Sequence, residues 1–312
     1  MSERAIVTEG LTKNFGSFGA VCDMNLEVKM GEVFGLLGPD GAGKTTTIRM
    51  LSTLVKPSRG KALVVGHDMI RESDKVRQMV GVVSDGVALY KELTVEENLK
   101  YLSTLYALPK GMAEKRITEL LEMFGLKEKA KRLFNTLSTG MAKKVMICAA
   151  LLHNPRVLLL DEVTSGLDPQ TAIALRDFAR SLRDQSVTVI WTTHYMDEPE
   201  KLCDRVGIIM EGKLIQIGTP GELKHRVNEL SVLEIEAAGL SSEQVDNIRG
   251  LSGSVIINYV DPTLQITSSG RESLIEDVAK TLLATGAKIK SINTREPTLE
   301  DAFLSLTTSQ GR

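Results

Sequence analysis

The sequence predicts an α/β protein in which a large domain, built on a mainly parallel sheet, precedes a small α+β domain. Through the first two-thirds of the chain, short apolar runs alternate with helical patterns, as in strand–helix–strand units. Beyond residue 221 the patterns follow the order β-α-β-β-α-β of the ferredoxin-like plan. A chain of 312 residues is long enough for one large and one small core. We therefore predict domains at 1–220 and 221–312.

Three strands of the large domain are predicted from apolar runs of the kind that parallel sheets bury on both faces. These runs are "EVFGLLG" (32–38), "RVLLLD" (156–161) and "VTVIWTTH" (187–194). A helical pattern follows each run, beginning at Lys44, at Pro169 and at Met196. Because the functional groups of such sheets gather at the carboxyl ends of the strands, we expect a site just after these runs.

The stretch 92–150 has little strand character and repeated helical spacing, as in "LTVEENLKYLSTLYAL" and "AEKRITELLEMFGL". We interpret it as a helical insertion. The small domain then supplies four strand patterns, "SVLEIEA" (231–237), "SVIINY" (254–259), "TLQITSS" (263–269) and "AKIKSIN" (287–293). Its helical patterns are "SSEQVDNIRG" (241–250), "RESLIEDVAKTLLATG" (271–286) and "TLEDAFLSL" (298–306).

Composition narrows the class of partners and the compartment. An apolar content of 42% is ordinary for a folded protein, and a net charge of −2 supplies no overall attraction for polyanions, which disfavours nucleic acid. Cys22, Cys148 and Cys203 form no CxxC pair, which favours a reducing compartment over a disulfide framework or a zinc site. The start "MSERAIVTEG" has no apolar signal core, and we expect a chain that does not cross a membrane by itself.

The stretch "GLLGPDGAGKTTTI" (35–48) fits the pattern G-x-x-x-x-G-K-[ST] between a strand and a helix. Backbone N–H groups of such a loop surround phosphate oxygens, and the helix start adds a positive dipole. We predict that Lys44 reaches the β- and γ-phosphates and that the Thr45 hydroxyl ligates Mg²⁺. The predicted nucleotide-binding residues of the loop are Gly38, Pro39, Asp40, Gly41, Ala42, Gly43, Lys44, Thr45 and Thr46.

Hydrolysis also needs a carboxylate that anchors the metal and a group that orients water. The run "VLLLDE" ends a buried strand with Asp161, which can hold the Mg²⁺ shell, and Glu162, which can polarise the attacking water. His194 ends the next strand in "WTTH", where a neutral imidazole can hydrogen-bond a γ-phosphate or the water. Acidic residues at strand ends are often only solvated, and a lone histidine is more often structural. These assignments therefore depend on the phosphate loop.

A further helix start lies in "FNTLSTGMAKKVMICAALL", where Ser138 suits an N-cap and Gly140 permits close approach. Alone, this pattern indicates simple capping. Taken together, the motifs resemble the nucleotide-binding subunit of an ABC transporter over about residues 5–220. The motifs occur in the family's order and approximate spacing. They are the loop "GPDGAGKTT", the signature-like "LSTGM" (137–141), the Walker B-like "LLLDE", the D-loop-like "SGLD" (165–168) and the "TTH" of the switch histidine.

This resemblance implies an ABC-type P-loop NTPase fold with an antiparallel β portion, a helical subdomain at 92–150, and ATP and Mg²⁺ as cofactors. It implies that Ser138 and Gly140 contribute to the ATP site of a second copy of the chain or of a related ATPase subunit, and it makes Asp168 of the D-loop a further nucleotide-binding candidate. A helix dipole directed at an anion is the physical reason. It also makes Phe15, in "LTKNFG", the candidate for stacking on adenine, although a core phenylalanine fits the sequence equally well.

The sequence departs from the family at several positions. Asp85 stands where the family usually has the glutamine of the Q-loop. An aspartate can ligate Mg²⁺, but its charge weakens ATP binding unless a cation is adjacent. The candidate metal ligands are thus Thr45, Asp161 and Asp85. Thr139, Met141 and Val163 replace the glycine, glutamine and proline that are common in the family. Because the lysine, both Walker B carboxylates and the histidine remain, we predict an active ATPase.

The function that the resemblance implies is transport, in which ATP-dependent dimer closure drives polytopic permease subunits from the cytoplasmic face of the membrane. Closure is expected to move segment 86–100 against a helix of the permease. The tail "REPTLEDAFLSLT" (295–307) resembles that of drug-resistance, sodium-efflux and polysaccharide exporters, which favours export. The alternatives are a soluble ABC ATPase acting on ribosomes or DNA, and a regulatory ATP-binding module with low turnover. The sequence does not indicate the transported substance.

Overall fold

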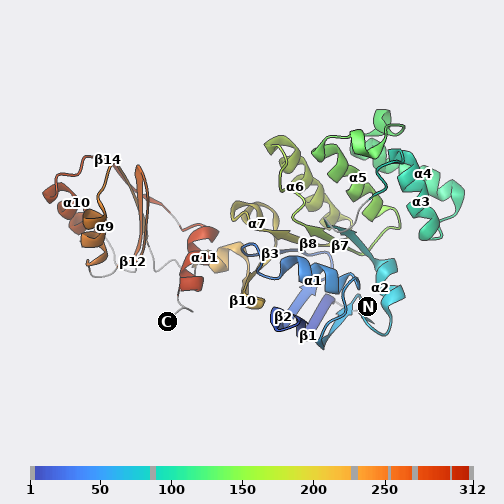
Figure 1. Cartoon of the computed structure of the whole chain (residues 1–312), viewed down its shortest axis with the longest axis horizontal. Helices are drawn as coiled ribbons and strands as arrows, with labels where there is room; N and C mark the ends of the chain where they lie inside the picture. The colour runs from blue at the N-terminus through green and yellow to red at the C-terminus, as the bar shows by residue number, and fades with distance from the viewer. Residues whose placement is uncertain are drawn as a thin grey trace. The chain divides into compact units, whose positions relative to one another are not determined.

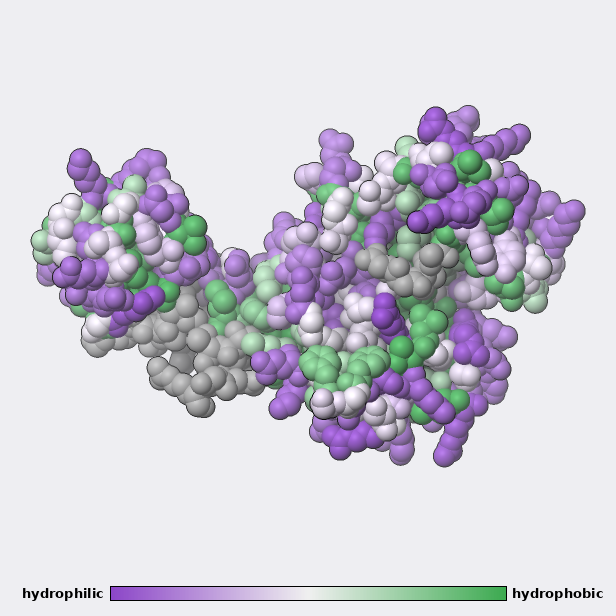
Figure 2. All heavy atoms as spheres, in the orientation of Figure 1, coloured by the Kyte–Doolittle hydropathy of each residue, from purple (hydrophilic) through white to green (hydrophobic). Residues whose placement is uncertain are grey.

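The computed structural model describes residues 4–84, 89–225, 231–251, 254–268, 273–295 and 297–308 (Figure 1). The chain forms two compact units, Met1–Ile217 and Gly218–Arg312. The division lies close to the predicted boundary at residue 220. On both units, hydrophilic side chains cover most of the face seen in Figure 2. In the described part of the chain, no helix combines the length and the apolar character that crossing a bilayer requires.

A six-stranded sheet with the order β10-β9-β3-β8-β7-β6 is the centre of the first unit. Its strands are β3 (Val33–Leu37), β6 (Val80–Val83), β7 (Val157–Asp161), β8 (Thr188–Thr193), β9 (Arg205–Met210) and β10 (Lys213–Gly218). The five strands from β9 to β6 pair in parallel, and every residue of β3, β7 and β8 is buried. The three strands predicted from apolar runs and the mainly parallel sheet are therefore confirmed.

Helices follow these strands at the predicted places. They are α1 (Lys44–Leu51) after β3, α6 (Pro169–Asp184) after β7 and α7 (Asp197–Leu202) after β8, with α2 (Ser73–Met79) before β6. The start of α6 is fixed locally, because Oδ1 of Asp168 accepts a hydrogen bond from the N–H of Thr171 at 3.0 Å and Pro169 occupies the first turn.

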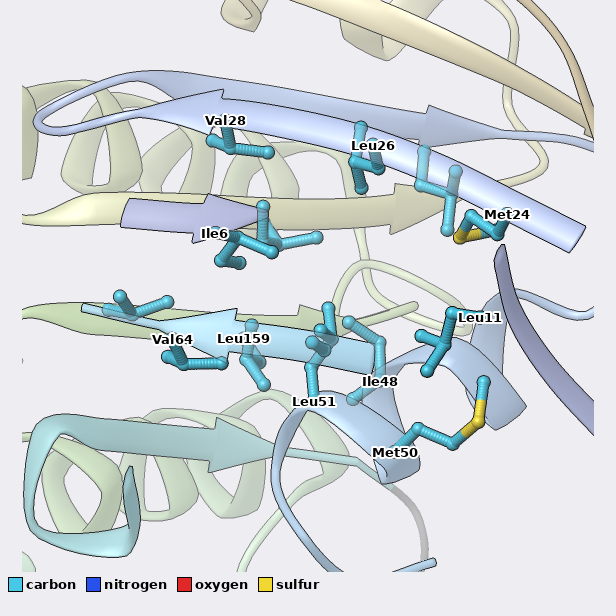
Figure 3. Close-up of a cluster of buried hydrophobic side chains, with 14 of the residues drawn as sticks. Ile6, Leu11, Met24, Leu26, Val28, Ile48, Met50, Leu51, Val64 and Leu159 are labelled. Atoms are coloured by element: carbon cyan, nitrogen blue, oxygen red, sulfur yellow. The ribbon is translucent and has the colours of Figure 1, made fainter. Parts of the chain in front are cut away.

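An antiparallel sheet with the order β2-β1-β4-β5 accompanies the parallel one. Its strands are β1 (Arg4–Phe15), β2 (Phe18–Lys29), β4 (Arg59–Val64) and β5 (His67–Asp68). Ile6 and Leu26 of this sheet, Ile48 and Leu51 of α1, and Leu159 of β7 belong to one buried cluster (Figure 3). The cluster fixes α1, and with it the loop that opens α1, between the two sheets.

The predicted helical insertion consists of α3 (Val95–Leu105), α4 (Lys110–Met123) and α5 (Thr139–Leu151). Two short 3₁₀ turns, Lys127–Lys129 and Phe134–Thr136, connect α4 to α5. A capping box starts α3, in which the Thr94 side chain accepts from the N–H of Glu97 and the Glu97 side chain accepts from the N–H of Thr94.

The second unit contains α8 (Pro220–His225), β11 (Ser231–Ala237), α9 (Ser242–Arg249), β12 (Ser254–Val260), β13 (Thr263–Ser268), α10 (Ser273–Ala284), β14 (Ile289–Arg295) and α11 (Leu299–Thr308). Its sheet has the order β12-β13-β11-β14, and the paired strands are antiparallel. The first strand of the unit thus lies between its third and its fourth, which confirms the predicted ferredoxin-like plan.

Candidate functional site

The loop between β3 and α1 requires glycine at two positions. A Cβ on Gly38 would lie 2.2 Å from the carbonyl oxygen of Ile209, and one on Gly43 would lie 2.4 Å from that of Ala20. Gly43 also has φ = 107°, which side chains disfavour. No side chain caps α1, so the first N–H groups of this helix remain available to an anion.

Lys44 is the first residue of α1, directly after this loop, and is only 4% exposed. Its Nζ donates hydrogen bonds to the carbonyl oxygens of Gly38 at 2.7 Å and Pro39 at 2.9 Å, and it forms an ion pair with Oε1 of Glu162 at 3.1 Å. The lysine therefore connects the loop to the end of β7. A cavity of about 350 Å³ adjoins it and is lined by Phe15, Phe18, Ala20, Asp40, Gly41, Gly43, Lys44, Thr45, Thr46 and Glu162.

Asp161 occupies the carboxyl end of β7 and is 5% exposed. Its Oδ2 accepts a hydrogen bond from Oγ of Ser84 at 2.9 Å, and its Oδ1 accepts one from Oγ1 of Thr192 at 2.7 Å. Among the residues that the structure describes, no ion pair joins Asp161 to a basic side chain. A buried carboxylate without a cationic partner is unfavourable, so the site fits a divalent cation bound by oxygen ligands.

Glu162 follows in a left-handed backbone conformation with φ = 48°. Its N–H approaches both the carbonyl oxygen of Thr192 at 3.2 Å and Oγ1 of the same residue at 3.1 Å. Its Oε2 lies 3.4 Å from Nδ1 of His194, which in turn lies 3.8 Å from Oδ1 of Asp40. Nδ1 of His194 is buried, and no described residue lies in hydrogen-bond geometry with it. The carboxylate and the imidazole are therefore adjacent at the edge of the phosphate loop.

The aromatic residues of the cavity flank the turn between β1 and β2. Phe15 pairs with Phe18 across β1 and β2, and the two are 52% and 62% exposed. Phe15 is thus not a core residue, and Nζ of Lys13 lies 5.0 Å from the centroid of its ring. Sequence reasoning missed Phe18, because its position opposite Phe15 depends on the register of the hairpin.

The predicted nucleotide-binding residues of the signature and the D-loop, Ser138, Gly140 and Asp168, do not line this cavity. Ser138 is an exposed N-cap whose Oγ accepts from the N–H of Met141 at 3.4 Å, and Asp168 is the exposed N-cap of α6. Hydrogen bonds from the side chain and the backbone of Thr171 hold the pKa of Asp168 below its usual value. A Cβ on Gly140 would lie 3.2 Å from Cγ2 of Thr171, so the starts of α5 and α6 are adjacent. Asp85 lies outside the described residues.

Three features define a P-loop nucleotide hydrolase: a glycine loop that links β3 to a helix, an acidic pair at the carboxyl end of β7, and a histidine that follows β8, the strand between them. A family model described as "ABC transporter" matches residues 21–165. Full-length relatives match both units of the chain, and the chain belongs to the ATP-binding subunits of ABC transporters. It is an ATPase, and the resemblance inferred from its motifs is confirmed.

Two relatives show how far the likeness extends. The linearmycin resistance ATP-binding protein LnrL of Bacillus subtilis (strain 168) is 38% identical over 301 residues, which cover 96% of this chain and 97% of the relative. The daunorubicin/doxorubicin resistance ATP-binding protein DrrA of Streptomyces peucetius is 37% identical over 310 residues, covering 97% of this chain and 92% of the relative. These names support the transporter interpretation over the soluble and regulatory alternatives.

Solved structures agree with the fold. An ATP-binding subunit of an ABC transporter superposes with a TM-score of 0.66 at 28% identity, over 72% of this chain and 93% of the other. A dimeric ATP-binding cassette in a post-hydrolysis state, bound to ADP and Pi, superposes with a TM-score of 0.63 at 26% identity, over 69% of this chain and 98% of the other.

Proposed function

We propose that the chain binds Mg-ATP at the Lys44 loop and hydrolyses it with Glu162 to drive a permease. The observation that carries this proposal is the cluster in which Lys44, Glu162 and His194 adjoin the loop, next to a buried Asp161 that has no cationic partner among the described residues. Thr45 and Asp161 would hold Mg²⁺, with Asp85 as a further candidate ligand. The ion supplies charge neutralisation for the phosphate oxygens when it is bound.

Each residue of the site has a separate role in binding or hydrolysis. Backbone N–H groups of the loop and of the first turn of α1 receive the phosphates, and Lys44 exchanges its contact with Glu162 for phosphate oxygens. Glu162 orients the attacking water and accepts its proton, and His194 donates a hydrogen bond to the γ-phosphate. Phe15 offers its exposed ring to the adenine.

The catalytic assembly requires a second chain. Ser138, Gly140 and Asp168 lie at two adjacent helix starts outside the cavity, where a nucleotide held by another subunit can reach them. The dimeric state of one structural neighbour supports a dimer of this chain or a pair with a related subunit. The transmembrane partner would be a polytopic permease, with this subunit at the cytoplasmic face. Relatives named for drug resistance favour export.

The test is the rate of phosphate release by the full chain, purified with its permease in lipid nanodiscs. We expect Lys44→Ala to abolish nucleotide binding, and Glu162→Gln to abolish turnover while binding remains. Glu119→Gln, on α4, is the matched control and should keep the wild-type rate. Turnover that Glu162→Gln leaves unchanged would contradict the assignment of the water-orienting residue.

A further inference from the structure

A row of buried polar side chains crosses three adjacent strands at their carboxyl ends. Asp161 pairs with Thr192 across β7 and β8, and Ser84 directly follows Val83, which pairs with Leu160 across β6 and β7. Ser84, Asp161 and Thr192 are 1%, 5% and 0% exposed. The parallel register thus places one hydroxyl on each side of the carboxylate.

The two hydroxyls determine the orientation of Asp161. Each carboxylate oxygen accepts one hydrogen bond, from Ser84 at 2.9 Å and from Thr192 at 2.7 Å, so the side chain is held on both sides. A carboxylate has about four lone-pair sites, so each oxygen keeps capacity for a further ligand. The arrangement is fixed before any cation binds, which lowers the reorganisation that binding requires.

Thr192 also binds the backbone of Glu162, the residue that follows Asp161. Its Oγ1 and its carbonyl oxygen both lie within 3.2 Å of the N–H of Glu162, whose backbone is left-handed. A left-handed glutamate is unfavourable unless its surroundings determine it. One threonine therefore fixes the direction of the metal-binding carboxylate and the backbone of the water-orienting residue.

We propose that Thr192 and Ser84 are positioning residues that orient Asp161 for Mg²⁺, and that Thr192 also sets the conformation of Glu162. This inference rests on the proposed function. Neither residue touches the nucleotide in the proposed arrangement, so their effect passes through the two acidic residues.

The experiment measures binding of mant-ATP, a fluorescent ATP analogue, as Mg²⁺ is titrated. The full chain carries Glu162→Gln so that the nucleotide stays intact. We expect Thr192→Val and Ser84→Ala each to raise the Mg²⁺ concentration for half-maximal binding about 10- to 100-fold, the usual effect of removing a hydrogen bond that orients a metal ligand. Binding without Mg²⁺ should stay unchanged. Thr192→Ser, which keeps the hydroxyl, should restore most of the wild-type Mg²⁺ dependence.

Thr188→Val is the matched control. Thr188 lies on the same strand at its other end, is fully buried, and accepts a hydrogen bond from the N–H of Gly31 at 2.9 Å. If Thr192 had only a structural role, Thr188→Val and Thr192→Val would lower the melting temperature equally, and neither would change the Mg²⁺ dependence of mant-ATP binding. That result would overturn the inference. If Thr192→Val does not fold, the same comparison is made with Ser84→Ala, and an unchanged Mg²⁺ dependence in that variant would overturn the inference. Wild-type nucleotide binding by Lys44→Ala would instead refute the proposed function.

Discussion

Replacing Glu162 by glutamine should tighten ATP binding while it removes turnover. Without nucleotide, the Glu162 carboxylate is an ion-pair partner of Lys44, which is almost fully buried. Nucleotide binding must break this contact, because the same ammonium is needed by the phosphates. Glutamine removes the charge of the competing group and also its repulsion of the γ-phosphate.

The magnitude follows from the geometry. Two unit charges 3.1 Å apart attract by about 5 kcal/mol at an effective dielectric constant of about 20, and desolvation offsets much of this. A hydrogen bond to a charged group retains a net value of about 1.5–3 kcal/mol. The bonds from Lys44 to the carbonyl oxygens of Gly38 and Pro39 are common to the wild type and to Glu162→Gln, so they cancel in the comparison. A gain of at least about 1.4 kcal/mol, or tenfold in affinity, is therefore expected.

The assay is equilibrium binding of mant-ATP in Mg²⁺, paired with phosphate release. Loss of the general base should lower turnover by about 10²–10⁴-fold. Glu119→Gln, which removes a carboxylate of α4, should change neither quantity. Weaker or unchanged binding by Glu162→Gln would show that the Lys44–Glu162 ion pair does not oppose the nucleotide.

Three further predictions concern adenine stacking and the pH dependence of stability. Phe15→Ala should weaken ATP binding by about 1–3 kcal/mol through lost stacking while triphosphate binding persists; equal loss for inorganic triphosphate would contradict this. Burial lowers the pKa of His153 to about 4, so the folded state binds a proton at this residue less readily than the unfolded state does. The free energy of unfolding should therefore fall as the pH drops from about 6.5 towards 4. His153→Phe should make the free energy of unfolding, measured with urea, less dependent on pH over that range. Burial raises the pKa of Asp301, but hydrogen bonds from Arg295 and Thr298 outweigh the effect of burial and hold this pKa below 3.8. The ionised carboxylate therefore stabilises the folded state above pH 3.8, and this stabilisation is lost as the pH falls through the lower pKa of the folded state. Asp301→Asn should cost about 1.5–3 kcal/mol near pH 7, the value of a hydrogen bond between charged groups, measured by calorimetry; no loss would contradict the ion pair.

Local signals were sufficient for much of the fold and for part of the site. The glycine loop, the buried strand that ends in Asp161 and the start of α6 at Pro169 all depend on neighbouring residues, so the sequence predicts them directly. The position of Ser138 opposite a partner stays a prediction, since it depends on a second chain.

Contacts between distant segments could not be predicted in the same way. The hydroxyls of Ser84 and Thr192 meet Asp161 only because β6, β7 and β8 are neighbours, and strand order is set by long-range packing. The antiparallel sheet was reached through the family resemblance, because its strands are separated in the chain by the phosphate loop and α1.

The central claim, that the loop of one chain and the α5 start of another share one nucleotide, can be tested by mixing two defective variants. Both carry Glu162→Gln; one adds Lys44→Ala, which disables its own loop, and the other adds Ser138→Arg, which blocks its helix start. Light scattering after size-exclusion chromatography in Mg-ATP should show a dimer holding ATP only in the mixture, because one complete site forms there. A mixture that traps no more nucleotide than the separate variants would contradict a shared site.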